Sequence, residues 1–575
     1  MPKLQACLRT AGPAAFFLFL TVFLTWPLAA RMGSGISPSP DSLLNLWALA
    51  WNYHVLPRDP LSLFDANIFF PRQDTLAYSE HLFGVALLAA PAYLVTGNAI
   101  FAYNVAIALS FFLSGIGMYL LVHELTGNRW AALASGVIYA AAPYRFLQLF
   151  HIQLLSYQWF PFVFLFLWRF LRDGRPRQLV AVVIFSLLQI LSCNYYAMYL
   201  ALAFVLLGIV LLFVGRSTLD LKKLLLLSAG AAVVGLTALP LFLPYERNRV
   251  EQGYYRRYED VLQFSAEPLD YLRPSAYNKV FYVDYLPQQL RSEKALFPGA
   301  LAIVLGAVGW AATRRKKKSE GEPSRRVARA FFLVLTISGF LLSLGPRLEL
   351  GDETTIFLPY GFLYRHVPGF QGLRVPARIT VLFLLGLAAF AGWGVVWLLG
   401  WIARWKPGWQ PAIGGAVVLL LILDYQSYSL ARVLPPAPPM PPVYAWLATQ
   451  PGDFGLLELP IHEDITKESV RMYYSTAHWK NLANGFSGWW PNDYWILVGR
   501  MRYFPTSGIL RFLERDVPVR LILIHYEEYA ERQRAKLRQD MQRYHERMPI
   551  RAQFGPDVVY ELLPDTPRET PGTEP

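Results

Sequence analysis

Long apolar runs separated by short basic loops dominate this sequence and restrict what it can fold into. A membrane-spanning helix needs about 20 consecutive apolar residues, and such runs recur between residues 12 and 430. Only 16% of the 575 residues are charged, against roughly 25% in average soluble domains, and the mean hydropathy is +0.31. The pattern predicts a polytopic α-helical membrane protein.

About eleven segments are predicted to span the membrane. They cover residues 12–30, 101–122, 130–144, 152–171, 178–193, 196–215, 224–245, 296–313, 327–345, 381–403 and 412–430. A further apolar run, residues 82–97, is ambiguous because it contains Pro91 and ends at Gly97. Both residues suit a broken element that lies against protein.

The basic loops decide whether residues 82–97 cross the membrane. If they do not cross, nearly every short basic loop falls on the same side as the N-terminus. These loops are Arg129, 169–177, 216–223, 314–326 and 404–406. Lys and Arg collect in cytoplasmic loops, so we expect residues 82–97 to be re-entrant or to lie along the surface. The N-terminus is then cytoplasmic, and the net charge of +13 reflects these loops rather than nucleic-acid binding.

The predicted organisation has four parts. They are a transmembrane domain (1–430, with outer loops 31–100 and 246–299), a Pro-rich linker (431–442), an extracytoplasmic domain (443–563) and a disordered tail (564–575). The extracytoplasmic domain is predicted to be α/β or α+β, because three of its segments read as strands and one as a solvated helix. The strands are 455–461, 519–525 and 557–563, and the helix is 527–547.

Acidic residues gather in the outer loops and are nearly absent from the middle of the predicted spans. Asp41 opens a short amphipathic helix with Trp47 and Trp51 along one side, and Glu80 precedes His81. A carboxylate near a low-dielectric wall can have its pKa raised toward the range of a general base. Asp41 also suits the N-cap of the helix that follows, and both roles can hold together.

The order of these features resembles the GT-C superfamily of integral-membrane glycosyltransferases, which includes protein mannosyltransferases, aminoarabinose transferases and oligosaccharyltransferases. The likeness runs from Met1 to about Thr380. It rests on "PDSLLNLWALAW" (40–51), "FDANIFFPRQDTLAYSEHLFG" (64–84), "HIQLLSYQWFP" (151–161), "FSAEPLDYLRPS" (264–275) and "LRVPAR" (373–378). These stretches are similar to patterns in uncharacterised bacterial members.

The resemblance implies an inverting glycosyltransferase in the cytoplasmic membrane. It would transfer a sugar from a polyprenyl-phosphate donor to a glycan, lipid or protein acceptor at the outer face. The resemblance also assigns the role of catalytic base to Asp41, and Glu80 is the candidate second acid. Aromatic rings stack on sugars, and polar residues at a span entrance can face the same cavity. The candidate substrate- and acceptor-binding residues are Trp47, Trp51, His81, His151 and Gln153.

A departing phosphate needs cations, and Arg binds phosphate in bidentate fashion. The candidate phosphate-binding residues are Arg374, Arg378, Arg256 and Arg257. Asp65 and Asn67 form "DAN", a poor substitute for the DxD of metal-dependent members. Mg²⁺ or Mn²⁺ could bind Asp65 only if the fold brings Asp41 and Glu80 to it, and a metal-free site stays open.

Two other classes of function stay open. The absence of DxD allows a non-catalytic GT-C-like scaffold that binds glycan. A transporter of lipid or polysaccharide would need polar residues at the bilayer midplane and repeated halves, and the sequence has neither. The aromatic stretch 485–495, "GFSGWWPNDYW", is predicted to form a buried core rather than a glycan contact.

Overall fold

The structure is a computed structural model that describes most of the chain. It covers residues 2–215, 218–274, 278, 280, 291–314, 323–350, 354–426, 434–461 and 464–565. Nearly all of the predicted disordered tail, much of the basic loop 314–326 and part of the linker 431–442 lie outside the described residues.

The chain forms two compact units, and the residue ranges of these units differ from those of the predicted domains. Unit 1 comprises Met1–Gly35, Leu82–Leu243 and Tyr254–Pro435, and unit 2 comprises Ile36–His81, Pro244–Gly253 and Pro436–Pro575. Most of the first predicted outer loop therefore belongs to the same unit as the C-terminal region.

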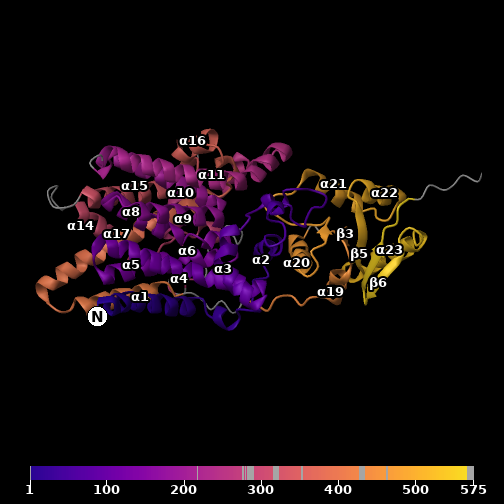
Figure 1. Ribbon diagram of the computed structural model, residues 1–575, viewed down its shortest axis with the longest axis horizontal. Helices are drawn as coiled ribbons and strands as arrows, with labels where there is room; N and C mark the ends of the chain where they lie inside the picture. Colours follow the sequence, from indigo (N-terminus) through magenta and orange to yellow (C-terminus); the bar gives the residue numbers. More distant parts are fainter. Residues whose placement is uncertain are drawn as a thin grey trace, which may run out of the picture. The chain divides into compact units, whose positions relative to one another are not determined.

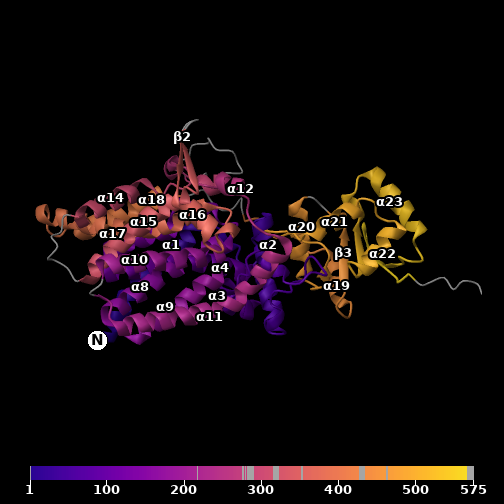
Figure 2. The same ribbon diagram turned by 90° about the horizontal axis from the view of Figure 1, so that it is seen from above.

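Unit 1 is a bundle of helices that run side by side (Figures 1 and 2). Its helices are α1 (Pro2–Leu24), α3 (Phe83–Thr96), α4 (Ala99–Thr126), α5 (Arg129–Ala141), α6 (Pro143–Leu147), α7 (Ile152–Leu155), α8 (Trp159–Asp173), α9 (Pro176–Ser192), α10 (Asn194–Val214), the first part of α11 (Leu221–Gln252), α12 (Tyr258–Gln263), α13 (Arg291–Lys294), α14 (Ala300–Arg314), α15 (Pro323–Ser343), α16 (Pro359–His366), α17 (Thr380–Trp405) and α18 (Gln410–Asp424). A hairpin of β1 (Arg347–Leu350) and β2 (Thr354–Phe357) precedes α16.

Each predicted span overlaps one or more helices of the bundle: residues 152–171 contain α7 and most of α8, and residues 427–430 at the end of the last span lie outside the described residues. Six helical segments of the described chain are long and apolar enough to cross a membrane, and several shorter apolar helices accompany them. The fold of a polytopic α-helical membrane protein is therefore confirmed, and the number of spans stays a prediction. Residues 82–97 form one helix, α3, which contains Pro91 and packs against α4 and α9.

Two Gly-Asn pairs set the boundaries of the first long helices. Gly97 and Gly127 end α3 and α4 with φ of +63° and +68°, a left-handed conformation that glycine adopts without steric cost. The next residue then caps the following helix: the Asn98 side chain accepts a hydrogen bond from the Phe101 N–H, and Asn128 from those of Trp130 and Ala131. These junctions are local and readable in the sequence.

Close approach of α14 to α17 depends on two glycines. A Cβ on Gly309 would meet the backbone oxygen of Phe390, and a Cβ on Gly394 would meet that of Leu305. Small residues at such crossings let helix backbones touch in membrane proteins. The helix pair is therefore specified by glycine positions rather than by large apolar side chains.

The connection between α5 and α8 lies inside the bundle. Its short helices α6 and α7 are largely buried, and Arg145 is fully buried within them. The Arg145 guanidinium donates hydrogen bonds to Ser114, Ser110 and the Leu155 carbonyl. It also lies between the rings of Phe111 and Tyr157, at 4.3 and 4.5 Å from their centroids. Irregular backbone at membrane depth is tolerated where protein covers it, and Arg145 ties this segment to α4.

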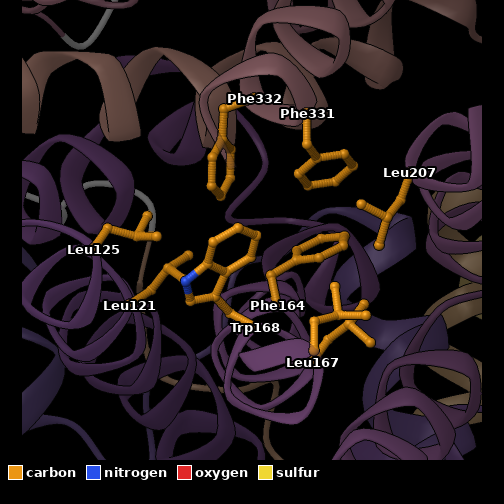
Figure 3. A pocket seen from close by; sticks show the side chains of 9 residues that line it. Leu121, Leu125, Phe164, Leu167, Trp168, Leu207, Phe331 and Phe332 are labelled. Carbon is orange, nitrogen blue, oxygen red and sulfur yellow. The ribbon is translucent and has the colours of Figure 1, made fainter. Parts of the chain in front are cut away.

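A small apolar pocket lies between α4, α8, α10 and α15. Phe331 and Phe332 of α15 point toward Phe164 and Trp168 of α8 (Figure 3). Its volume is about 10 Å³, roughly the space of one water molecule. A pocket of this size with a wholly apolar lining does not suit a sugar or a phosphate, so it is a packing defect rather than a substrate site.

Unit 2 contains a five-stranded mixed sheet in the order β4-β3-β5-β7-β6; β3, β5 and β6 are labelled in Figure 1. Its elements are α2 (Pro40–Val55), α19 (Pro442–Thr449), β3 (Gly455–Leu459), α20 (Ile465–Ser475), β4 (Asn481–Leu482), α21 (Asn492–Met501), α22 (Ser507–Arg515), β5 (Val519–His525), α23 (Glu531–Arg543), β6 (Ile550–Phe554) and β7 (Asp557–Glu561). Strands β4, β3 and β5 are parallel, and β7 and β6 are antiparallel to their neighbours. The predicted C-terminal sheet is confirmed.

Residues 67–70 of the first loop bind along the edge strand β4. The Leu482 N–H donates to the Asn67 carbonyl, the Phe70 N–H to the Leu482 carbonyl, and the Phe69 N–H to the Asn484 carbonyl. An edge strand presents unpaired backbone groups, and the loop satisfies them. This pairing is why the first loop belongs to unit 2.

Candidate functional site

Asp41, the predicted base, lies in the first turn of α2 within unit 2. The N-cap of α2 is Ser39 and Pro40 takes the first helical position, so the alternative that Asp41 is the N-cap is wrong. Proline pre-sets the helical φ at this position, and the helix begins two residues earlier than an N-cap at Asp41 would give. A carboxylate in the first turn is favoured by the helix dipole, and the Asp41 side chain is half-buried.

The two tryptophans of α2 are part of the core of unit 2. Trp47 is 1% exposed, and its indole N–H donates to Asn67 Oδ1 at 3.0 Å. The indole N–H of Trp51 donates to the Leu63 carbonyl at 2.8 Å, and its ring packs near His54 and Trp479. Satisfied, buried indoles have a structural role, and the predicted contact of either ring with a sugar gains no support from this packing.

Asp65 and Asn67 of the "DAN" stretch form hydrogen bonds within unit 2. The Asn67 side-chain amide donates to the Lys480 carbonyl at 3.0 Å and to Ser475 Oγ at 3.3 Å. Asp65 accepts a hydrogen bond from the Asp74 N–H at 2.9 Å, and Asp74 forms an ion pair with Arg247 at 2.9 Å. Burial raises the pKa of Asp74 above its ordinary value, although Arg247 opposes the shift.

The predicted metal site is not assembled. Among the residues that the structure describes, no group of three or more His, Cys, Asp or Glu side chains is arranged to bind a metal ion. Asp41, Asp65 and Glu80 therefore do not form the oxygen cluster that Mg²⁺ or Mn²⁺ would require. Asp65 fixes the loop through the hydrogen bond that it accepts from the Asp74 N–H, and its assignment as a metal ligand stays a prediction without support from this arrangement.

Glu80 lies in a loop whose backbone is fixed by Tyr245, from the end of α11. The Tyr245 hydroxyl donates to the Ser79 carbonyl at 2.9 Å and accepts from the His81 N–H at 3.1 Å. Asn52 of α2 donates to the His81 carbonyl at 2.8 Å. Burial lowers the pKa of His81 to about 4, so its ring is neutral at pH 7. Glu80 is half-buried between these two fixed residues.

Arg378 of unit 1 forms a buried ion pair that the sequence did not predict. Its guanidinium reaches both carboxylate oxygens of Glu293, and the shortest separation is 2.5 Å. Burial by itself would raise the pKa of Glu293, but the charge of Arg378 outweighs it and the pKa lies below its ordinary value. The guanidinium also lies 4.9 Å from the centre of the Tyr195 ring. Because Glu293 neutralises it, Arg378 is better suited to positioning than to direct phosphate binding.

Arg374 is the exposed guanidinium of the same region. It lies 4.9 Å over the Phe264 ring, and its backbone N–H donates to the Tyr195 hydroxyl at 3.3 Å. No carboxylate of the described chain forms an ion pair with Arg374. Tyr195 therefore contacts both arginines of the "LRVPAR" stretch, with Arg378 under the ring and Arg374 at the hydroxyl.

Arg256 joins this group, whereas Arg257 does not. The Arg256 N–H donates to the Gln371 carbonyl at 2.9 Å, and its carbonyl accepts from the Tyr364 hydroxyl at 2.7 Å. Burial, together with the charges of Arg374 and Arg378, lowers the pKa of Arg256 to about 10. Arg257 is exposed and lies 3.6 Å from Asp260. Three of the four predicted arginines are thus close enough to repel one another.

His151 and Gln153 lie in the buried connection between α5 and α8. His151 lies within electrostatic reach of Glu293, and Gln148, one turn earlier, donates a long hydrogen bond of 3.5 Å to the same carboxylate. Gln153 Oε1 is buried with no hydrogen-bond partner among the described residues. His151 is therefore brought to the arginine group, and its predicted role in acceptor binding stays a prediction.

Sequence reasoning missed Glu293 and Tyr195. Glu293 stands in "RSEKALFPG", a polar stretch directly before the α14 span, and Tyr195 follows the helix start at Asn194. The only available signal was an acid and a phenol at span entrances on the same predicted side. Partners 85 residues apart, such as Arg378 and Glu293, are not paired by any local pattern.

The fold is similar to that of solved sugar transferases. One is the arabinofuranosyltransferase AftD from Mycobacteria, with a TM-score of 0.59, 15% identity, and coverage of 97% of this chain and 40% of that chain. Another is the Archaeoglobus fulgidus oligosaccharyltransferase in the apo form, with a TM-score of 0.50, 11% identity, and coverage of 90% and 70%. This chain therefore spans about two fifths of the length of AftD. The likeness defines the class: a membrane protein with the GT-C glycosyltransferase fold.

The particular family follows from the sequence. Residues 58–423 match the family described as "Domain of unknown function (DUF6311)", and the chain belongs to this family. No curated protein matches the sequence.

Proposed function

We propose that the protein is an inverting membrane glycosyltransferase that uses a polyprenyl-phosphate-linked sugar at the outer face of the cytoplasmic membrane. The acceptor is a glycan, a lipid or a protein. The observation that carries the proposal is the arginine group of unit 1, which consists of Arg256, Arg374 and Arg378. The GT-C fold is consistent with it.

An anionic ligand explains the arginine group better than structure alone. Like charges at close range destabilise one another, and the Glu293 carboxylate forms its ion pair with Arg378. Arg256 stays cationic at pH 7 with a pKa of about 10, and Arg374 is exposed. A phosphate accepts several charge-assisted hydrogen bonds from guanidinium groups. Arg374 is the proposed direct ligand, with Arg256 beside it and Arg378 as a positioning residue.

The proposed base is Asp41, with Glu80 as a second acid that orients the acceptor hydroxyl. A base must take the acceptor proton while the phosphate leaves from the opposite side of the sugar. His81 is neutral and buried, so it does not compete for this proton. The backbone clamp by Tyr245 and Asn52 fixes the loop that carries Glu80.

The experiment separates binding from transfer in the full-length protein in nanodiscs. A panel of radiolabelled polyprenyl-phosphate sugars is tested for transfer, and a photoreactive polyprenyl phosphate measures binding. Arg374→Gln removes charge-assisted hydrogen bonds, each worth about 1.5–3 kcal/mol, so binding should weaken on the order of tenfold to a hundredfold. Asp41→Asn should keep binding and lose transfer by about 10²–10⁴-fold.

Arg365→Gln is the matched control, because Arg365 is an exposed arginine of the neighbouring helix α16. It should change neither binding nor transfer. Full transfer by Asp41→Asn would refute the assignment of the base. Equal binding of the polyprenyl phosphate by wild type and Arg374→Gln would refute the phosphate site. If the wild type binds the polyprenyl phosphate but transfers sugar from none of the donors, the result would favour a non-catalytic scaffold.

A further inference from the structure

Helix α21 of unit 2 presents apolar side chains on both of its sides. Its inner side buries Tyr494, Leu497 and Val498 in the unit. Its outer side carries Trp495 and Ile496, which are 52% and 54% exposed. A solvated helix normally has charged or polar residues on that side, so the outer side of α21 is unusual.

Other residues extend this exposed surface. Tyr503, two residues past the end of α21, is 75% exposed, and Trp490 packs 5.8 Å from Trp495. Arg500 is exposed and lies 4.1 Å over the Phe512 ring, and no carboxylate of the described chain pairs with it. We call Trp495, Ile496, Arg500 and Tyr503 the α21 surface. The prediction that residues 485–495 form a buried core is wrong for Trp495.

The other long exposed helix of unit 2 lacks these features. In α23 only Leu537 and Met541 are buried, and the exposed positions carry charged or amide side chains, with Ala535 as the exception. The α21 surface is therefore not a general property of this basic, solvated region. It combines aromatic, aliphatic and cationic groups, which is the composition of surfaces that lie in the lipid headgroup layer.

The first residues of α21 are connected to a segment that emerges from an apolar helix. Asn492 donates through its backbone and side-chain N–H groups to Gln252 at 3.1 and 3.3 Å. Gln252 is the last residue of α11. It is seven residues past the predicted span 224–245 (252 − 245 = 7), which is about 10 Å of helix at 1.5 Å per residue. Each headgroup layer of a bilayer is about 5–7 Å thick, so Gln252 lies near the outer boundary of this layer.

We propose that the α21 surface docks into the outer headgroup layer of the membrane, with Trp495 and Ile496 at the acyl boundary and Arg500 at anionic phosphate groups. The inference does not depend on the proposed transfer reaction. A bilayer fits the surface better than a protein partner does, because α21 is hydrogen-bonded to the last residue of α11, a helix whose earlier part is a predicted membrane span.

The test uses the full chain in nanodiscs, with Cys7 and Cys193 replaced by Ser. A bimane label is attached after Trp495→Cys, after Ile496→Cys and, as the control on α23, after Gln539→Cys. Brominated phospholipids should remove more than half of the emission at positions 495 and 496 and little at 539. Aqueous iodide should show the reverse. Arg500→Gln should reduce the lipid quenching at 495 in anionic nanodiscs, while Arg532→Gln on α23 should not.

Three results would overturn the proposal. Iodide quenching at 495 and 496 equal to that at 539 would show a fully solvated surface. Protection from both quenchers would show that protein covers it. Iodide accessibility that falls only when an oligosaccharide is added would show a glycan site.

Discussion

A buried charged network in unit 2 gives the sharpest stability prediction. His525, at the end of β5, lies with Nε2 3.1 Å from Glu458 Oε2 and Nδ1 2.9 Å from Asp557 Oδ1. Ionised carboxylates only accept hydrogen bonds, so both ring nitrogens donate and the ring is an imidazolium. Glu458 is 0% exposed and also accepts from the Tyr444 hydroxyl at 2.7 Å.

The magnitude follows from the shifted pKa values. Burial would lower the pKa of His525, but the bonds to Asp557 and Glu458 outweigh it and raise the pKa to about 9 from 6.5. One pKa unit corresponds to about 1.4 kcal/mol, so the network contributes on the order of 3 kcal/mol. Because the folded pKa is raised, this contribution is complete below pH 6.5 and is lost as the pH rises through 9. The pKa of Glu458 is lowered, so its own contribution is lost only in acid.

Glu458→Gln keeps the shape and removes the charge. Removing one partner of a buried pair costs about 3–5 kcal/mol, so local opening of β3 and β5 should become about a hundredfold to several thousandfold more frequent. Hydrogen exchange of the peptides that cover these strands measures the opening, after correction for the intrinsic effect of pH on exchange. Wild type should lose protection between pH 7 and 10, and the variant should lose less.

Glu546→Gln is the matched control, because Glu546 is exposed. Two outcomes would refute the reasoning. One is equal exchange at pH 7 in Glu458→Gln and Glu546→Gln. The other is wild-type protection of β3 and β5 that does not change up to pH 10, which would mean that the imidazolium contributes no net stability.

Two further predictions concern unit 1. Glu293→Gln leaves a buried arginine without its counter-ion, and we expect a loss of about 3–5 kcal/mol in thermal unfolding in detergent. Glu267→Gln, at a half-exposed pair, should cost at most about 1 kcal/mol, and equal losses would contradict the buried pair. Gly394→Ala places a methyl group against the α14 backbone, and we expect a loss of about 1–3 kcal/mol. Gly400→Ala on the same helix meets nothing within 4 Å and should be neutral, so similar melting of both variants would refute the close contact.

The elements that the sequence predicted correctly depend on local physics. The apolar runs coincide with helices, and the three β-rich runs of the C-terminal region are β3, β5 and β7. The N-cap of α2 was missed because Ser39 and Asp41 both suit an N-cap and Pro40 suits the first helical position, and a two-residue difference decides between the alternatives. Trp47 was predicted on a ligand-facing side, because the helical pattern of α2 does not say which side another segment will cover.

The sequence by itself determined the membrane class and the helical character of the apolar runs, since each depends on neighbouring residues and the solvent around them. Only the tertiary structure decided that residues 67–70 form backbone hydrogen bonds along the edge strand β4, which lies more than 400 positions away in the sequence. It also decided that Glu293 neutralises Arg378 and leaves Arg374 exposed. Hydrogen bonding and charge pairing act across space, and one sequence contains many equally suitable partners for each group. Packing of the whole chain selects among them.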